Sequence, residues 1–254
     1  MSIEFDPAWM MAVFLVSLRI GILLMMSPIF TSLNGLVTVR LLLTLMLSSM
    51  LVSGLGLASP LTDLSIGTVL VAALQELAVG VTLAFGVMAA FGAFSVAGKI
   101  LDIQSGFGIG SVYDPVTRAG APMFATMLNM VAVVAFFSMD AHHAFMRGIA
   151  YSLTQVAPGA GLAALQADAV VRQFGLMFSL GVSLIIPVML CLLLVEAGLA
   201  VVSRVLPQMN VFIVLVPVKL FAGLVLFALT LSALGPSMNR VYAAIFHFWE
   251  QAVG

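Results

Sequence analysis

Six apolar runs, each of about twenty residues or more, dominate this sequence. A helix of that length spans the hydrocarbon core of a bilayer. Hydrophobic residues make up 63% of the 254 residues and charged residues 7%, too few for the surface of a water-soluble domain. We therefore expect an all-α fold, a multi-helix hydrophobic bundle of helical hairpins associated with a membrane, in a single domain over residues 1–254. The runs lie near residues 8–30, 36–59, 64–98, 121–151, 169–203 and 209–235.

The remaining composition argues against several classes of function. A net charge of −1, from nine basic and ten acidic residues, gives no electrostatic footprint for nucleic acid. The single cysteine, Cys191, cannot form an intrachain disulfide and has no second thiol for a metal site. The sequence holds no GxSxG, HExxH, Walker or dinucleotide-binding motif. We therefore expect no enzyme activity and no cofactor, and Glu4 and Asp6 argue against a cleaved signal peptide.

The third and fifth runs, of about thirty-five residues, exceed the roughly 17–25 residues that cross a bilayer, so their helices must tilt, break or extend beyond it. In the third run four glycines recur every six residues, a step that does not return to one helix face. They predict close contact with neighbours on several sides, unless they are the loosely patterned small residues common in membrane helices. The glycines are Gly80, Gly86, Gly92 and Gly98.

Charged residues inside or at the edges of the apolar runs need partners or water, because an unpaired charge there costs several kcal/mol. If the last two runs form a hairpin near Pro207, Glu196 lies eleven residues before the turn and Lys219 twelve after it. Equal rise per residue brings both to one depth, which predicts a Glu196–Lys219 ion pair. Alternatively, each charge faces another subunit or a solvated cavity. The charged residues are Arg19, Glu76, Asp140, Arg172, Glu196 and Lys219.

The segment DAHH places Asp140, His142 and His143 together, which superficially offers an acid, a base and metal ligands. Adjacent histidines on a helix point about 100° apart, and a zinc site needs three or four ligands. His247 is the only other histidine in the chain. We therefore expect no metal or proton-relay role, and interpret the segment as a polar helix end with His143 and Arg147 on one face.

A glycine-rich segment, Gln104 to Ser111, combines flexible backbone with apolar side chains in the middle of the chain. Such backbone is tolerated at membrane depth only where protein encloses it or where it lines a cavity. The segment is typical either of a pore constriction or plug, or of an ordinary re-entrant turn. Its central residues are Gly106, Phe107, Gly108, Ile109, Gly110 and Ser111.

Several segments together resemble the FliR family of flagellar export-gate proteins and its injectisome relative SctT. They are RIGILLMMSPIF from Arg19, QELAVG from Gln75, AGKILDIQSGFGIGSVYDP from Ala97, the HH pair, and RVLPQMNVFIVLVPVK from Arg204. They occur in order over nearly the whole chain. The resemblance implies a core subunit that forms, with FliP and FliQ, a channel for unfolded flagellar substrates across the bacterial inner membrane. FlhB and FlhA of the export apparatus are implied as further partners, alongside inner-membrane lipids, at the flagellar basal body.

The resemblance also assigns roles to residues. The plug loop of the family corresponds to the stretch Gly106 to Ser111, with Phe107 and Ile109 closing the pore. The charges Arg19, Glu76, Asp140, Glu196 and Lys219 are then mainly contacts for assembly or ion pairing. The DAHH segment resembles the GHH of the flagellar branch, although Ala141 replaces the glycine. Two alternatives stay open: an SctT-type injectisome subunit, and a small-solute transporter with Glu76, Glu196 and Lys219 in its path.

Overall fold

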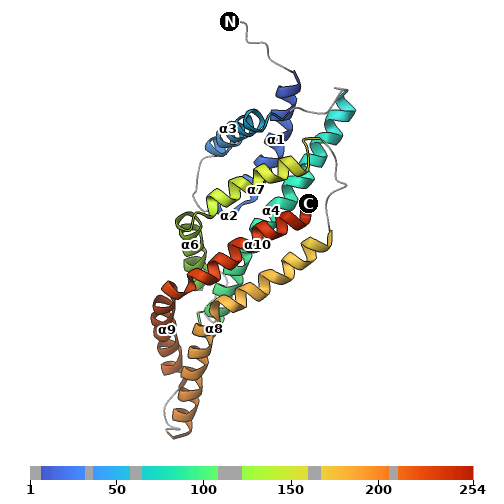
Figure 1. Cartoon of the computed structure of the whole chain (residues 1–254). Coiled ribbons are helices and arrows are strands. Elements are labelled where there is room, and N and C mark those ends of the chain that lie inside the picture. Colours follow the sequence, from blue (N-terminus) through green and yellow to red (C-terminus); the bar gives the residue numbers. More distant parts are fainter. Residues whose placement is uncertain are drawn as a thin grey trace. The chain divides into compact units, whose positions relative to one another are not determined.

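The computed structural model describes residues 7–31, 37–57, 65–107, 122–159, 167–205 and 211–253. Within these ranges the regular structure is entirely helical, which confirms the all-α prediction (Figure 1). The helices are α1 (Pro7–Met26), α2 (Pro28–Thr31), α3 (Val37–Leu55), α4 (Ile66–Ser105), α6 (Met123–Ser138), α7 (Ala141–Gln155), α8 (Ala167–Val205), α9 (Val211–Thr230), the 3-10 helix η1 (Leu231–Leu234) and α10 (Gly235–Val253).

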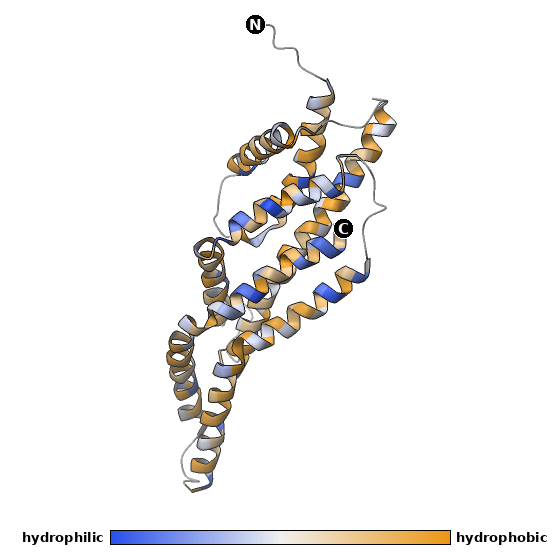
Figure 2. Cartoon of the chain, in the orientation of Figure 1, coloured by the Kyte–Doolittle hydropathy of each residue, from blue (hydrophilic) through white to orange (hydrophobic). Residues whose placement is uncertain are grey.

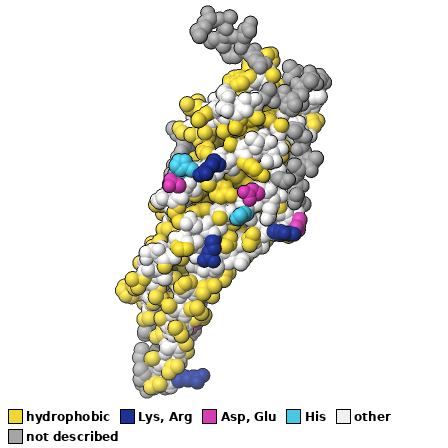
Figure 3. Space-filling view, viewed as in Figure 1, with side chains coloured by type: hydrophobic (Ala, Val, Ile, Leu, Met, Phe, Trp, Pro, Cys, Tyr) yellow, Lys and Arg dark blue, Asp and Glu magenta, His cyan; other side chains and the backbone are white. Residues whose placement is uncertain are grey.

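The longest helices follow the two overlong apolar runs without a break. α4 has 40 residues and α8 has 39, with Pro187 inside α8. Among the described residues, five helices are long and apolar enough to cross a membrane, or six if α6 and α7 together count as one span. Hydrophobic residues predominate along α4, α8 and α9 (Figure 2) and on the face that the space-filling view displays (Figure 3). Most of this surface is therefore suited to contact with lipid or with other protein.

Two features of the helix pattern differ from the prediction. The fourth run is two helices, because α6 ends before Met139 and Asp140 takes a left-handed backbone conformation, with φ 56°, before α7 begins. The last run ends at Thr230, and a further helix, α10, follows η1. α10 was missed because Arg240, His247 and Glu250 interrupt its apolar residues, which gives an amphipathic pattern instead of a continuous run.

The described residues group into two compact units, and three helices contribute to both. The first unit comprises residues 1–90, 140–174 and 243–254. In it α1 packs against α3, and Trp9 Nε1 donates a hydrogen bond to Ser53 Oγ at 3.3 Å. The buried Trp249 of α10 donates from Nε1 to the Leu83 carbonyl of α4 at 2.9 Å.

The second unit comprises residues 91–139 and 175–242. Its core is aromatic: the rings of Phe91, Phe94 and Phe136 each contact the ring of Tyr242, at centroid distances of 5.6 to 6.4 Å. The Tyr242 hydroxyl donates to the Ala132 carbonyl at 2.6 Å. The start of α10 is therefore fixed to α6 by a satisfied polar group as well as by ring contacts.

The four glycines of α4 face four different helices, which confirms the expected close contact on several sides. In the first unit, a Cβ on Gly80 would lie 2.9 Å from the Arg19 carbonyl oxygen of α1, and one on Gly86 would lie 2.5 Å from the Phe248 ring of α10. In the second unit, a Cβ on Gly92 would lie 2.6 Å from the Met177 sulfur of α8, and one on Gly98 would clash with the Ala125 backbone of α6. Larger side chains at these points would push the helices apart.

Candidate functional site: buried polar contacts and the stem of the glycine-rich loop

Arg19 and Glu76 form a two-point ion pair between α1 and α4 in the first unit. Arg19 Nε donates to Glu76 Oε2 at 2.7 Å and an Arg19 Nη donates to Oε1 at 3.0 Å. The two side chains are only 1% and 2% exposed. Such a pair stabilises a fold only when its remaining donors and acceptors are also satisfied.

The remaining polar atoms of this pair bind the backbone that follows α7. Arg19 donates to the carbonyl of Ser152 at 2.9 Å and to that of Val156 at 3.0 Å. The Gly159 amide donates to Glu76 Oε1 at 2.9 Å. Ser152 lies in the last turn of α7, where its carbonyl also accepts from the Val156 amide at 3.0 Å, and Val156 is the residue that ends the helix. The Val156 carbonyl is one of the acceptors that a helix end leaves without an intrahelical donor. The arginine therefore links α1, α4 and the end of α7.

Lys219 of α9 and Glu196 of α8 form the ion pair that the hairpin count predicts. Lys219 Nζ lies 2.8 Å from Glu196 Oε2, which confirms that prediction. The lysine side chain is 9% exposed and the glutamate side chain 48% exposed. The carboxylate is therefore half-hydrated while the ammonium is buried.

Three of the charges expected inside or at the edges of the apolar runs are exposed: Glu196, whose expected burial is wrong, Asp140 and Arg172. The side chain of Asp140 is 76% exposed and lies 3.4 Å from His143 Nδ1, so its expected burial is wrong although it has an ion-pair partner. Arg172 pairs with Asp168 one turn earlier on α8, at 2.7 Å. Asp140 and Arg172 lie at or near helix starts, Asp140 directly before α7 and Arg172 in the second turn of α8.

The glycine-rich segment begins where α4 ends. Gly106 has φ 89°, a left-handed conformation that ends helices and that glycine adopts without strain. Phe107 is half-buried and meets the ring of Phe124 edge to face at 6.0 Å, and Phe124 meets Phe227 of α9 in the same way at 5.7 Å. The predicted residues Gly108, Ile109, Gly110 and Ser111 lie outside the described residues.

Asp102 is a buried charge that the sequence reasoning missed. Its two carboxylate oxygens accept hydrogen bonds from the amides of Phe124 at 2.8 Å and Ala125 at 3.1 Å. These amides belong to the first turn of α6, which has no intrahelical acceptor for them and which favours a negative charge. Ser95 and Asn129 hydrogen-bond between the same two helices. The sequence signal that could have indicated this residue is the position of Asp102, an acidic residue four positions before Gly106, the first glycine of the loop.

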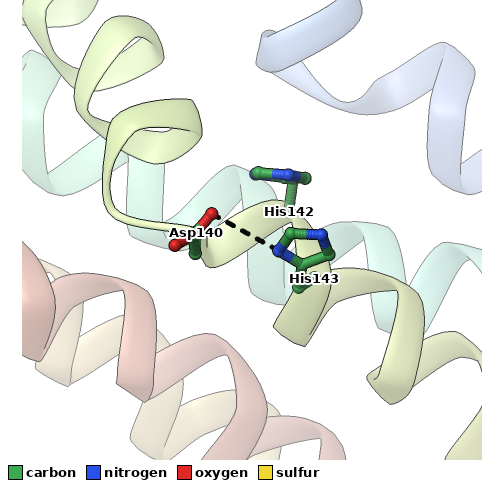
Figure 4. Close-up of side chains that lie close together, drawn as sticks. All are labelled: Asp140, His142 and His143. Atoms are coloured by element: carbon green, nitrogen blue, oxygen red, sulfur yellow. Dashed lines mark ion pairs between the residues drawn. The ribbon is translucent and has the colours of Figure 1, made fainter.

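The residues of the DAHH segment lie close together at the start of α7 (Figure 4). The ring centroids of His142 and His143 are 4.1 Å apart, so the expected divergence of the adjacent histidines is wrong. The two rings are tilted by 36° and His143 faces the Asp140 carboxylate. The segment is polar and lies at a helix terminus, as predicted, and that terminus is the start of α7.

Comparison with known proteins gives one consistent family. The family described as "Bacterial export proteins, family 1" matches residues 10–245. The flagellar biosynthetic protein FliR of Bacillus subtilis is 30% identical over 176 residues, 67% of this chain and 68% of that protein. FliR of Escherichia coli is 25% identical over 244 residues, 94% of this chain and 92% of that protein. The surface presentation of antigens protein SpaR of Shigella flexneri is 30% identical over 145 residues, 57% and 56% of the two chains.

Proposed function

Because the chain belongs to the bacterial export proteins, family 1, we propose that it is a core subunit of the flagellar type III protein-export gate. Residues 1–254 act as one FliR-like domain that assembles with FliP and FliQ into the channel for unfolded flagellar substrates. FlhB and FlhA are its further partners in the bacterial inner membrane. The observation that carries the proposal is the similarity to Escherichia coli FliR over 94% of the chain.

The chemical role is gating, with no bond made or broken. Gly106 to Ser111 form the plug, in which the apolar side chains of Phe107 and Ile109 exclude water and ions from the pore. Glycine backbone lets the plug change conformation at low cost when a substrate passes. Two contacts support a fixed stem for this loop: Asp102 binds the α6 amides, and Phe107 packs on Phe124. Energy for transport comes from other parts of the export machine.

Purification with the partners tests the assembly. Affinity capture of this chain from membranes is expected to recover FliP and FliQ in fixed proportion. If the chain alone forms a stable homo-oligomer that moves a small solute, it is a transporter and the proposal is wrong. The buried Glu76 then becomes the first residue to test in a transport path.

The plug is tested by the leak of ions across the inner membrane. Deletion of residues 106–110 is expected to depolarise cells that express the complete gate, measured with a potential-sensitive dye. Phe107→Ser should give a smaller leak in the same direction. Ile103→Ser is the matched control, because Ile103 lies one turn earlier on α4 and is 72% exposed. Unchanged membrane potential in both Phe107→Ser and the deletion would rule out the gating role.

The similarity to SpaR favours one second candidate, an SctT-type subunit of an injectisome. The two candidates differ in substrate and in partner. Complementation distinguishes them: the flagellar assignment predicts that the chain, supplied with its own FliP and FliQ, restores swimming motility to a strain that lacks FliR. Restored injectisome secretion without motility would support the second candidate.

A further inference from the structure

We propose that Asp140, His142 and His143 bind a divalent transition-metal ion of the zinc class. The three side chains come from four consecutive positions at the start of α7 (Figure 4). Each offers one ligand atom, and these atoms all lie within 4.8 Å of one another. Imidazole nitrogen and carboxylate oxygen are the ligands that Zn²⁺ and its neighbours Co²⁺, Ni²⁺ and Cu²⁺ accept together.

The distances suit such an ion. Zinc–ligand bonds of about 2.0–2.2 Å place neighbouring ligand atoms of a tetrahedral site about 3.4 Å apart. Asp140 Oδ1 and His143 Nδ1 are already 3.4 Å apart. The His142 ligand nitrogen lies within 4.8 Å of both atoms, so an ion would draw the His142 side chain closer to them.

The backbone holds the carboxylate on the same side as the histidines. Asp140 is the one non-glycine residue with positive φ among the described residues, at 56°. An aspartate in ordinary helical conformation would lie one helix position before Ala141 and point away from His142 by roughly 200°. The left-handed residue therefore changes the direction of the carboxylate relative to His142, and the rings of the two histidines, whose divergence argued against a site, meet at 4.1 Å.

The exposure of the cluster allows an ion to enter and leaves coordination positions open. The Asp140 and His143 side chains are 76% and 65% exposed, and His142 is half-buried. Three protein ligands leave at least one position for water. The proposal does not depend on the gating function and would stand for any role of the chain in export.

A second histidine–carboxylate pair provides a matched control. His247 Nδ1 lies 3.5 Å from Glu250 Oε2 with side chains 76% and 62% exposed, much like the Asp140–His143 pair. The two pairs differ in that the first also has His142 beside it. Loss of His247 should therefore leave metal binding unchanged.

Zinc binding by the purified full chain tests the proposal. The protein carries a tag without histidine and the substitution Cys191→Ser, so that neither a tag nor the single thiol binds metal. Zn²⁺ is titrated in competition with a chromogenic chelator, and one ion per chain at micromolar concentration is expected. His143→Gln and Asp140→Asn should each weaken binding at least about tenfold, whereas His247→Gln should not. Asparagine tolerates the left-handed conformation, so Asp140→Asn removes the ligand and keeps the fold.

Cobalt provides the second measurement. Co²⁺ bound by the three side chains should give visible d–d absorption bands that both variants lose and the His247→Gln control retains. Absence of micromolar zinc binding by the unsubstituted protein would overturn the proposal. Binding or cobalt bands that persist in both His143→Gln and Asp140→Asn would also overturn it, because the ion would then lie elsewhere.

Discussion

The two ion pairs inside the chain differ in how completely protein replaces water around them. Around Arg19 and Glu76, Arg19 donates two further hydrogen bonds to backbone carbonyls and Glu76 accepts one from a backbone amide, and both side chains are buried. Around Lys219 and Glu196 only the lysine is buried, and the carboxylate is 48% exposed. Removal of the cation therefore strands a buried carboxylate in the first pair and leaves a half-exposed, hydrated one in the second.

Loss of Arg19 should have the largest effect. Arg19→Met leaves the Glu76 carboxylate buried without its cation and removes the hydrogen bonds that Arg19 donates to the carbonyls of Ser152 and Val156. A cost of about 3–5 kcal/mol in unfolding free energy is expected, measured by denaturation of the purified protein in detergent. Arg204→Met is the control, because Arg204 is exposed on α8. Equal effects of the two substitutions would contradict the comparison.

Exchange of the charges sharpens the same contrast. Arg19→Glu with Glu76→Arg should not restore stability, because the two α7 carbonyls would then face a carboxylate in place of a guanidinium. Glu196→Lys with Lys219→Glu should recover most of what either single substitution loses, because in the described part of the chain these two side chains bind each other and not a backbone group. Recovery in both double variants would show that the backbone bonds around Arg19 matter little.

Alanine substitutions at glycines near the two pairs should change the unfolding free energy in opposite directions. A Cβ on Gly80 would lie 2.9 Å from the Arg19 carbonyl oxygen, so Gly80→Ala is expected to cost about 1–3 kcal/mol by pushing α1 away from α4. Gly198, two residues after Glu196, has nothing within 4 Å of such a Cβ. Gly198→Ala should instead stabilise α8 by up to about 1 kcal/mol. Paired denaturation curves measure the difference, and opposite signs are the expected outcome.

Loss of Lys219 should have a smaller effect than loss of Arg19. Lys219→Met replaces a buried ammonium with an apolar side chain of similar length, while Glu196 turns to solvent. The expected cost is about 1 kcal/mol or less. A double-mutant cycle with Glu196→Gln measures the coupling between the two side chains. A coupling as large as that of the Arg19–Glu76 pair would contradict the role given to solvent.

The exposed pair on α8 should have the smallest effect. Arg172 and Asp168 lie one turn apart with side chains 69% and 71% exposed. Arg172→Ala is expected to change the unfolding free energy by no more than about 0.5 kcal/mol, and less still at high salt. A large loss of unfolding free energy in the purified Arg172→Ala chain would mean that side-chain exposure does not predict the contribution of an ion pair to stability.

The features predictable from the sequence were those that depend on local spacing. Long apolar runs indicated the helices, the position of Pro207 indicated the Glu196–Lys219 pair, and the six-residue step of the glycines indicated contact on several sides of α4. Each follows from the rise and turn of a helix, which the sequence alone determines.

The features that could not be predicted from the sequence depend on tertiary contacts. Arg19 and Glu76 are separated by 57 residues, so no spacing rule pairs them. Asp102 was overlooked because its partners are backbone amides of α6, which carry no side-chain signature. The cluster at Asp140 was judged by the ideal divergence of adjacent helix positions, whereas the rings of His142 and His143 meet at 4.1 Å.

Trp249 makes part of the chain directly observable. The chain has two tryptophans, and the indole of Trp249 is 1% exposed, next to Gly86 and Gly148, and hydrogen-bonded to the Leu83 carbonyl. In a Trp9→Phe background its fluorescence emission should lie at short wavelength and shift to the red when the first unit unfolds. Arg19 and Gly80 belong to that unit and Lys219 does not. One optical signal can therefore separate unfolding events that a global denaturation curve would merge.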